Sequence, residues 1–187
     1  MARVRRPRID GPAQGPYRTG SGVPTRNHSM KFSDFVASGA IRSHIDSSTK
    51  EGVIREMATA LVEAGRIPAS DLESIVKAIL KREDLGTTGI GRGVAVPHTK
   101  HPSVDKLVGT VAVSQEGIDF DSLDGDPVHL FFLLVSPPDQ PGQHLRALEN
   151  ISRQLRDDAF CRELKAARAP ADIQHLLEAA DNHGMVS

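Results

Sequence analysis

The residue best placed for chemistry in this sequence is His98, which follows a glycine-rich stretch and the short apolar run Val94–Pro97. A strand that ends at Pro97 presents the next side chain at the edge of a sheet, and proline restricts the local backbone. Imidazole is largely neutral near pH 7, so one ring nitrogen can attack while the other N–H is held by an acceptor. These features favour a histidine that accepts a phosphoryl group without needing a metal ion.

A phosphorylated histidine carries negative charge, and groups that can offset it precede His98. Backbone N–H groups of the loop predicted at Gly86–Gly93 and the guanidinium groups of Arg82 and Arg92 are the candidates. The loop lacks the Gly-Lys-Ser/Thr ending of a P-loop and no helix follows it as in a dinucleotide fingerprint, so it predicts no nucleotide site. By itself, a histidine after a strand is more often a polar surface or capping residue than a catalytic one.

Two amphipathic helices are predicted before this loop, at residues 49–64 and 71–83, because apolar residues recur there with helical spacing. Gly65 is suited to close the first helix in a left-handed conformation. Each helix start also carries the signature of a capping box. The two boxes are Ser48 with Glu51 and Ser70 with Glu73.

The period then changes to that of strands, and the nearly continuous apolar run 128–135 is typical of a central strand covered on both faces. Helical periodicity returns after a proline-rich loop at 137–142. Helices, then strands, then helices indicate a layered α/β domain. The predicted strands are 94–96, 107–113 and 128–135, and the later helices are 145–155, 159–167 and 171–180.

Composition narrows the class of protein. The 187 residues suit one domain, with 39% hydrophobic and 25% charged residues. The longest apolar run is far shorter than the ~20 residues that span a bilayer, so no membrane insertion is predicted. Cys161 is the sole cysteine and is expected in the core, which excludes an internal disulfide and a cysteine-based zinc cluster. We expect a cytoplasmic protein.

Residues 1–29 differ from the rest, with six arginines against one aspartate, several glycines and prolines, and few large apolar side chains. Such a segment cannot offset its ordering entropy by burial, so we predict a disordered basic tail before a domain at residues 30–187. The tail is interpreted as solvated chain or sequence before the true start, rather than as an arm that binds nucleic acid or acidic surfaces. No apolar segment follows the arginines, so a signal peptide is not predicted.

The stretch Ile79–Lys100, ILKREDLGTTGIGRGVAVPHTK, resembles the active-site region of phosphotransferase-system enzyme IIA proteins of the fructose–mannitol class. The resemblance extends over about residues 32–180 and is particularly close to the nitrogen-regulatory branch. Later blocks that also resemble the family are Gly117–Asp121, Asp126–Leu134, Pro137–Gln140, His144–Leu148 and Phe160–Lys165.

This resemblance implies a function and a site. The phosphorylated histidine of the family falls on His98, its second active-site histidine on His144 at a helix start, and its arginine on Arg82. The implied fold is a mixed sheet with helices on both sides. The implied donor is an HPr-type phosphocarrier protein, and the implied acceptor or effector is a IIB-type domain or a regulatory target. No cofactor, metal, nucleotide or nucleic acid is expected.

Alternatives remain open at this point. The sequence shows no transporter span and no IIB-like cysteine domain, which favours a regulatory role over sugar uptake. A module of the same fold that binds partners without being phosphorylated is the main rival, and a metal-dependent hydrolase using His98 and His101 is a distant one, since clear acidic or cysteine ligands are missing. His144 can also be a helix cap, Arg82 a solvated helix end and Arg92 a surface residue.

Overall fold

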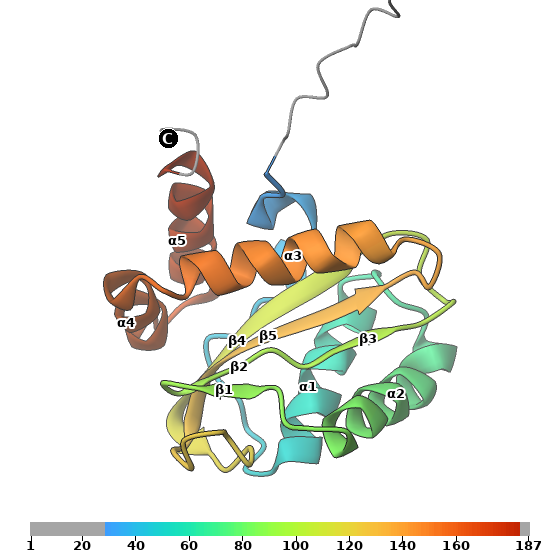
Figure 1. Ribbon diagram of the computed structural model, residues 1–187, viewed down its shortest axis with the longest axis horizontal. Coiled ribbons are helices and arrows are strands. Elements are labelled where there is room, and N and C mark those ends of the chain that lie inside the picture. The colour runs from blue at the N-terminus through green and yellow to red at the C-terminus, as the bar shows by residue number, and fades with distance from the viewer. Residues whose placement is uncertain (1–28, 184–187) are drawn as a thin grey trace, which may run out of the picture.

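Strand β5 (Val128–Ser136) is the centre of a mixed sheet (Figure 1). Strand β4 (Val108–Ile118) pairs with one edge of β5 in antiparallel orientation. Two short strands, β2 (Val94–Ala95) and β3 (His98–Lys100), lie in line along the other edge, both parallel to β5. Strand β1 (Gly89–Gly91) adds an antiparallel partner to β2. The prediction that residues 128–135 form the central strand is confirmed.

The computed structural model describes residues 29–183 as a single domain. The predicted disordered tail at residues 1–29 lies outside this range except for Ser29. None of the helices in the described range has the length and apolar character that a membrane crossing requires.

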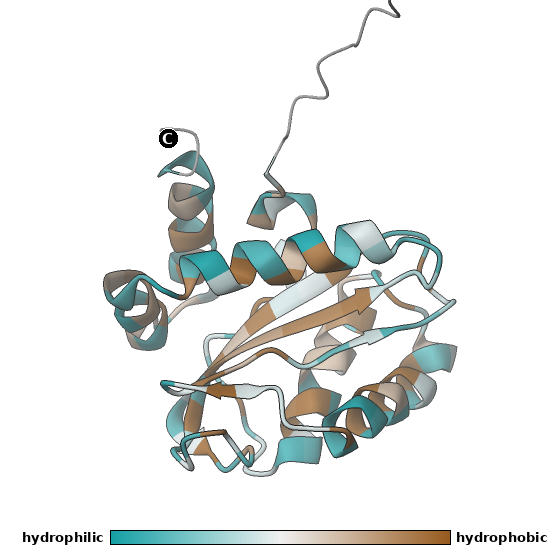
Figure 2. Ribbon diagram, in the orientation of Figure 1, coloured by the Kyte–Doolittle hydropathy of each residue, from teal (hydrophilic) through white to brown (hydrophobic). Residues whose placement is uncertain are grey.

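Alternate residues of β5 point to opposite faces of the sheet, and each face is covered by helices. Phe131, Leu133 and Val135 belong to the core formed with α1 (Lys50–Glu63) and α2 (Leu72–Asp84). The even-numbered residues from Leu130 to Leu134 belong to the core formed with helices α3 (Pro141–Gln154), α4 (Asp158–Ala166) and α5 (Pro170–His183). Burying one such side chain fully contributes about 1.5–3 kcal/mol. Figure 2 shows the apolar centre of the sheet between polar outer helix faces. The predicted fold class is therefore confirmed.

The predicted capping boxes are wrong, although the helices themselves are close to their predicted bounds. Helix α1 is capped by Thr49, whose hydroxyl accepts a hydrogen bond from the Gly52 N–H at 3.1 Å. Helix α2 has no side-chain cap and continues from a 3-10 turn, η3 (Ala69–Asp71). Each helix begins one residue later than its predicted box requires, so Glu51 and Glu73 lie at the second helical position rather than the third. Both carboxylates instead form ion pairs with Arg55.

The C-terminal end of α1 follows its prediction. Gly65 has φ +66°, a left-handed conformation that glycine adopts without steric cost. The Arg66 N–H donates to the Leu61 carbonyl at 2.8 Å, and the Gly65 N–H donates to the Val62 carbonyl at 2.9 Å. These two bonds satisfy carbonyls that would otherwise be unpaired at the helix end.

The glycine-rich stretch is more regular than predicted, because part of it forms the hairpin between β1 and β2. Gly91, Arg92 and Gly93 all have positive φ, which reverses the chain tightly enough for Gly89–Gly91 to pair with β2. The Asp124 carboxylate accepts a hydrogen bond from the Arg92 N–H at 2.8 Å and holds this turn. The prediction of a loop throughout residues 86–93 is therefore corrected.

A further correction concerns the strand expected to end at Pro97. Proline has no N–H and interrupts the ladder, but its carbonyl accepts a hydrogen bond from the Leu134 N–H at 3.0 Å. The chain therefore stays beside β5 and resumes as β3, with His98 opposite Leu134. His98 lies within a short strand rather than in a loop after one.

The two ends of the described chain meet at the 3-10 turn η1 (Phe32–Asp34), close to a second turn, η2 (Ser38–Ala40). The buried Asp181 carboxylate of α5 accepts hydrogen bonds from the Phe32 N–H at 2.6 Å and the Ser33 N–H at 3.0 Å. This contact fixes α5 against the start of the domain.

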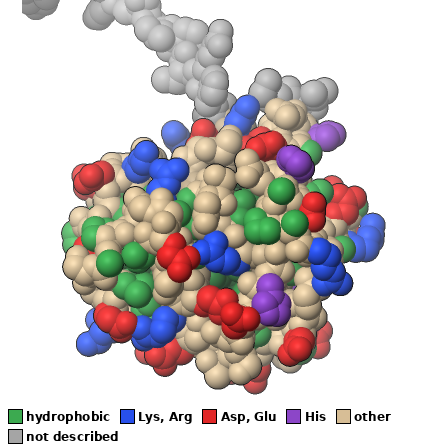
Figure 3. Space-filling view, turned by 180° about the vertical axis from the view of Figure 1, so that it is seen from behind, with side chains coloured by type: hydrophobic (Ala, Val, Ile, Leu, Met, Phe, Trp, Pro, Cys, Tyr) green, Lys and Arg blue, Asp and Glu red, His purple; other side chains and the backbone are tan. Residues whose placement is uncertain are grey.

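Seen from behind, acidic and basic side chains are interspersed over the surface (Figure 3).

Candidate functional site

His98 is positioned by the register between β3 and β5. Its Cα lies opposite Leu134, and Lys100 lies opposite Ser136. Paired residues of neighbouring strands share a face, and Leu134 belongs to the core beneath α3. The half-buried His98 ring therefore points toward the face of the sheet on which α3 begins.

One nitrogen of His98 is held by the backbone. The ring Nδ1 lies 2.7 Å from the Val96 carbonyl oxygen, which can only accept, so Nδ1 carries the proton and donates. Nε2 is then left with its lone pair. Burial, and next the charge of Arg82, lower the pKa of His98, outweighing the opposite effects of the Val96 hydrogen bond and the Glu83 charge. The neutral, nucleophilic ring is thus favoured near pH 7.

His144, in the first turn of α3, lies beside His98, with ring centroids 5.3 Å apart and planes inclined by 58°. It is 6% exposed, and its Nδ1 lies 2.7 Å from the Ser136 hydroxyl. Burial, followed by the charges of His98 and Lys100, lowers the pKa of His144 to about 4. Both rings are therefore neutral near pH 7.

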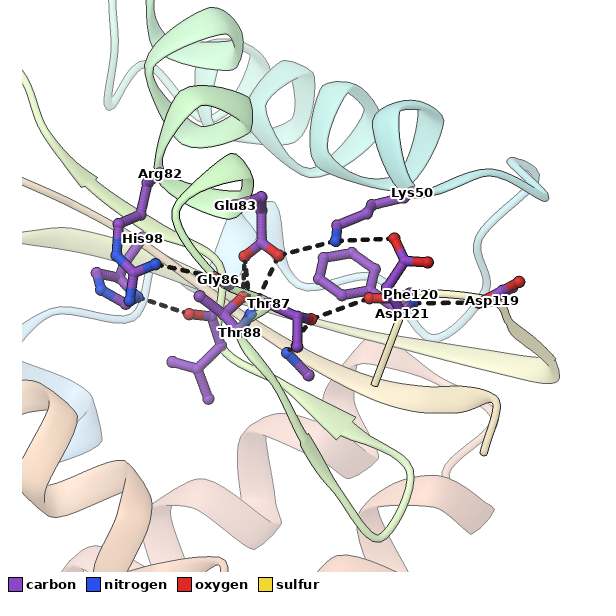
Figure 4. A network of polar contacts seen from close by, with 12 residues as sticks. Lys50, Arg82, Glu83, Gly86, Thr87, Thr88, His98, Asp119, Phe120 and Asp121 are labelled. Atoms are coloured by element: carbon purple, nitrogen blue, oxygen red, sulfur yellow. Dashed lines mark hydrogen bonds and ion pairs between the residues drawn. The ribbon is translucent and has the colours of Figure 1, made fainter. Parts of the chain in front are cut away.

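Arg82 approaches from the opposite side of the sheet edge, in the last turn of α2. Its guanidinium donates a hydrogen bond to the Gly86 carbonyl at 3.0 Å. Figure 4 shows this side chain extending from α2 toward the His98 ring, in agreement with its effect on the pKa of His98. The structure thus brings together His98, Arg82 and His144, the three residues predicted for the site.

Arg92 does not join this group. Its guanidinium forms an ion pair with Asp158 and donates to the Leu155 carbonyl, which connects the β1–β2 turn to α4. Arg92 is thus a surface residue with a structural contact, as its surface interpretation predicted.

His101 forms hydrogen bonds with two serine hydroxyls. Its Nε2 lies 3.1 Å from the Ser74 hydroxyl, and its Nδ1 lies 2.6 Å from the Ser103 hydroxyl. Residues 29–183 contain no group of three or more His, Cys, Asp or Glu side chains arranged to hold a metal ion. Cys161 is buried in the core, as predicted.

Three further residues around the site were missed by the sequence analysis. Ser136 is fully buried beside His144, and Glu83, which follows Arg82 in α2, forms a buried polar pair with Thr88. Glu83 carried a usable signal, because a carboxylate in the last turn of a helix opposes the helix dipole and so calls for a specific partner. No sequence signal marked Ser136, because its partner His144 belongs to a later helix.

A neutral histidine on a sheet edge, flanked by a second histidine and an arginine, defines a class of site suited to phosphoryl transfer through a histidine. Comparison with known families agrees with this class. The chain belongs to the family described as phosphoenolpyruvate-dependent sugar phosphotransferase system, EIIA 2, whose model matches residues 34–180. Members of this family are components of the phosphotransferase system.

Individual relatives come from both regulatory and sugar-specific proteins. A nitrogen regulatory protein of Bradyrhizobium diazoefficiens is 37% identical over 148 residues, 79% of this chain and 95% of that protein. The fructose-specific EIIABC component of Bacillus subtilis is 35% identical over 81% of this chain, which spans only 24% of that longer protein. Nitrogen regulatory protein IIA-Ntr of Neisseria meningitidis is similar in structure, with a TM-score of 0.69, 26% identity, and coverage of 77% of this chain and 97% of that one.

Proposed function

We propose that this protein is a histidine phosphocarrier that accepts a phosphoryl group on Nε2 of His98 from an HPr-type phosphohistidine protein. The observation that carries the proposal is the hydrogen bond from Nδ1 to the Val96 carbonyl. This bond selects the tautomer in which Nε2 is the nucleophile, and it places that nitrogen in the site that Arg82 and His144 flank.

In the transfer step, the Nε2 lone pair forms a new P–N bond as the P–N bond of the donor breaks. The donor imidazole keeps the electron pair of the broken bond. Each ring retains its other N–H, so the positive charge of the phosphorylated ring moves with the phosphoryl group and no free proton is required. Little other covalent chemistry is involved, so the protein contributes mainly by positioning and charge stabilisation.

Arg82 and His144 stabilise the phosphoryl oxygens in this proposal. The Arg82 guanidinium offers charged N–H donors. When the Ser136 hydroxyl donates to Nδ1 of His144, the proton of that neutral ring is on Nε2, which becomes a donor to a phosphoryl oxygen. The N-terminal end of α3 adds a favourable dipole for negative charge.

We propose that the phosphorylation state mainly serves regulation, through binding to a target protein. The support is the similarity to nitrogen regulatory proteins over most of both chains. The alternative output is transfer to a IIB-type domain in sugar uptake, supported by similarity to part of a fructose-specific EIIABC protein. A non-phosphorylated docking module of the same fold is the rival from a different class.

The proposal is tested by incubating the protein with phosphoenolpyruvate, enzyme I and an HPr-type carrier, and then measuring acid-labile phosphate by intact-protein mass spectrometry. We expect one phosphoryl group per chain and none in His98→Gln. His175→Gln, which alters an exposed histidine of α5, is the matched control and should label normally. If the carrier becomes phosphorylated while this protein does not, the docking module replaces the phosphocarrier.

A further inference from the structure

Glu83 is a buried carboxylate whose surroundings account for its presence at the end of α2. It is 5% exposed, and its two carboxylate oxygens lie 3.2 and 3.1 Å from the Thr88 N–H, while the Thr88 hydroxyl also donates to it. The Lys50 ammonium lies 3.0 Å away from the same carboxylate (Figure 4). Burying a charge is costly unless it is paired and hydrogen-bonded, and here both conditions are met.

The hydrogen bonds continue from Glu83 to the His98 ring. The Thr88 carbonyl accepts from the Val96 N–H at 3.0 Å, and the Val96 carbonyl accepts from Nδ1 of His98 at 2.7 Å. Glu83 therefore fixes Thr88 by hydrogen bonds, and Thr88 in turn fixes the Val96 peptide. The carbonyl of this peptide selects the tautomer of His98. Gly86, whose carbonyl accepts from Arg82, lies in the same short segment between Glu83 and Thr88.

Lys50 supplies the charge that keeps this arrangement paired. Its side chain is 20% exposed and that of Glu83 is 2% exposed, so water screens the pair weakly. Lys50 also lies 3.3 Å from Asp121 and 4.7 Å from the centre of the Phe120 ring. Asp121 is itself 79% exposed, so Glu83 is the buried partner of this lysine.

We propose that Glu83, supported by Thr88 and Lys50, is a positioning residue that fixes the Nδ1–H tautomer of His98 through the Val96 peptide and keeps Nε2 free for the phosphoryl group. This inference rests on the proposed function for its kinetic consequence, whereas its consequence for the tautomer can be measured without phosphorylation. The charged groups that act on the His98 ring are Arg82 and Glu83 of α2, with His144 of α3 beside it.

The test compares Glu83→Gln with Asp84→Asn, which removes an exposed carboxylate from the adjacent position of the same helix. The ¹⁵N chemical shifts of the His98 ring, measured on the unphosphorylated protein, report the ratio of the two neutral tautomers. In Glu83→Gln we expect this ratio to move toward the Nε2–H form by about tenfold, the order of effect that loss of one hydrogen bond produces. Asp84→Asn should match the wild type.

Phosphorylation kinetics provide the second readout. At saturating phosphorylated carrier, the rate of His98 labelling should fall by about tenfold in Glu83→Gln, with the KM for the carrier changed by less than about twofold, because the defect lies in orientation rather than docking. Thr88→Val, which keeps the backbone N–H and carbonyl but removes the hydroxyl, should shift both readouts in the same direction by a smaller factor.

A folded Glu83→Gln protein with a wild-type tautomer ratio would overturn the inference. If Glu83→Gln does not fold, Thr88→Val decides the matter, and an unchanged tautomer ratio in that variant would also overturn it. Failure of the wild-type protein to take up phosphate would instead contradict the proposed function. The tautomer ratio would then still decide whether Glu83 positions His98.

Discussion

The burial of His144 beside His98 predicts that acid destabilises this protein. The pKa of this buried side chain is about 4 in the folded protein, against 6.5 for an unperturbed histidine. At pH values between these two pKa values, His144 is protonated in the unfolded chain but neutral in the folded protein. Stability is therefore complete above pH 6.5 and is lost as the pH falls toward 4. The pKa of His98 is lowered as well, which adds in the same direction.

The size of the effect follows from the difference in pKa. A change of one pKa unit corresponds to about 1.4 kcal/mol, so the shift of His144 to about 4 costs roughly 3 kcal/mol of unfolding free energy by pH 4. The side chain is only 6% exposed, so solvent screening reduces this figure little. Relative to a typical domain stability of about 5–15 kcal/mol, such a loss is easily measured.

Urea unfolding at a series of pH values from 7.5 to 4 provides the assay, with wild type, His144→Gln and His175→Gln compared. All three proteins share the titration of their carboxylates, so only the difference between curves is interpreted. We expect the wild type to lose roughly 3 kcal/mol more than His144→Gln over this range, and His175→Gln to follow the wild type. Parallel curves for wild type and His144→Gln would refute the assignment of the acid sensitivity to this residue.

Three further variants test the contacts around the site and between the chain ends. Lys50→Met should lower the unfolding free energy by about 2–3 kcal/mol in urea titrations, because it leaves Glu83 buried without its counter-charge, whereas the exposed Lys77→Met should change it little. Ser136→Ala should slow phosphorylation about tenfold while the fold persists, because it removes the hydroxyl that we propose as the donor to Nδ1 of His144, and an unaltered rate would argue against that orientation. Asp181→Ala should cost about 2 kcal/mol, measured by thermal or urea unfolding, because two N–H groups of η1 lose their acceptor, and an unchanged stability would show that this contact does not hold α5.

Much of the fold was predictable because it depends on local periodicity and composition. The apolar run of β5 identified the central strand, and the helical spacing of apolar residues identified α1, α2 and α3 within a few residues. The errors concern helix starts and the hairpin of β1 and β2, which lies in a stretch predicted to be a loop. Thr49 and Asp71, rather than Ser48 and Ser70, precede the first helical residue, so neither Glu51 nor Glu73 lies at the position that a capping box requires.

For the proposed site, the sequence by itself determined which groups are candidates: an imidazole after a proline, with an arginine and a second histidine indicated by resemblance to a family. Only the tertiary structure decided how these groups meet. The register of β3 on β5 directs His98 toward α3, where the two rings lie 5.3 Å apart. Burial, followed by the charge of His98, lowers the pKa of His144 there. The Nδ1–H tautomer likewise depends on the path from Glu83 through Thr88 to Val96. Such contacts join residues through strand register and burial, which no local pattern encodes.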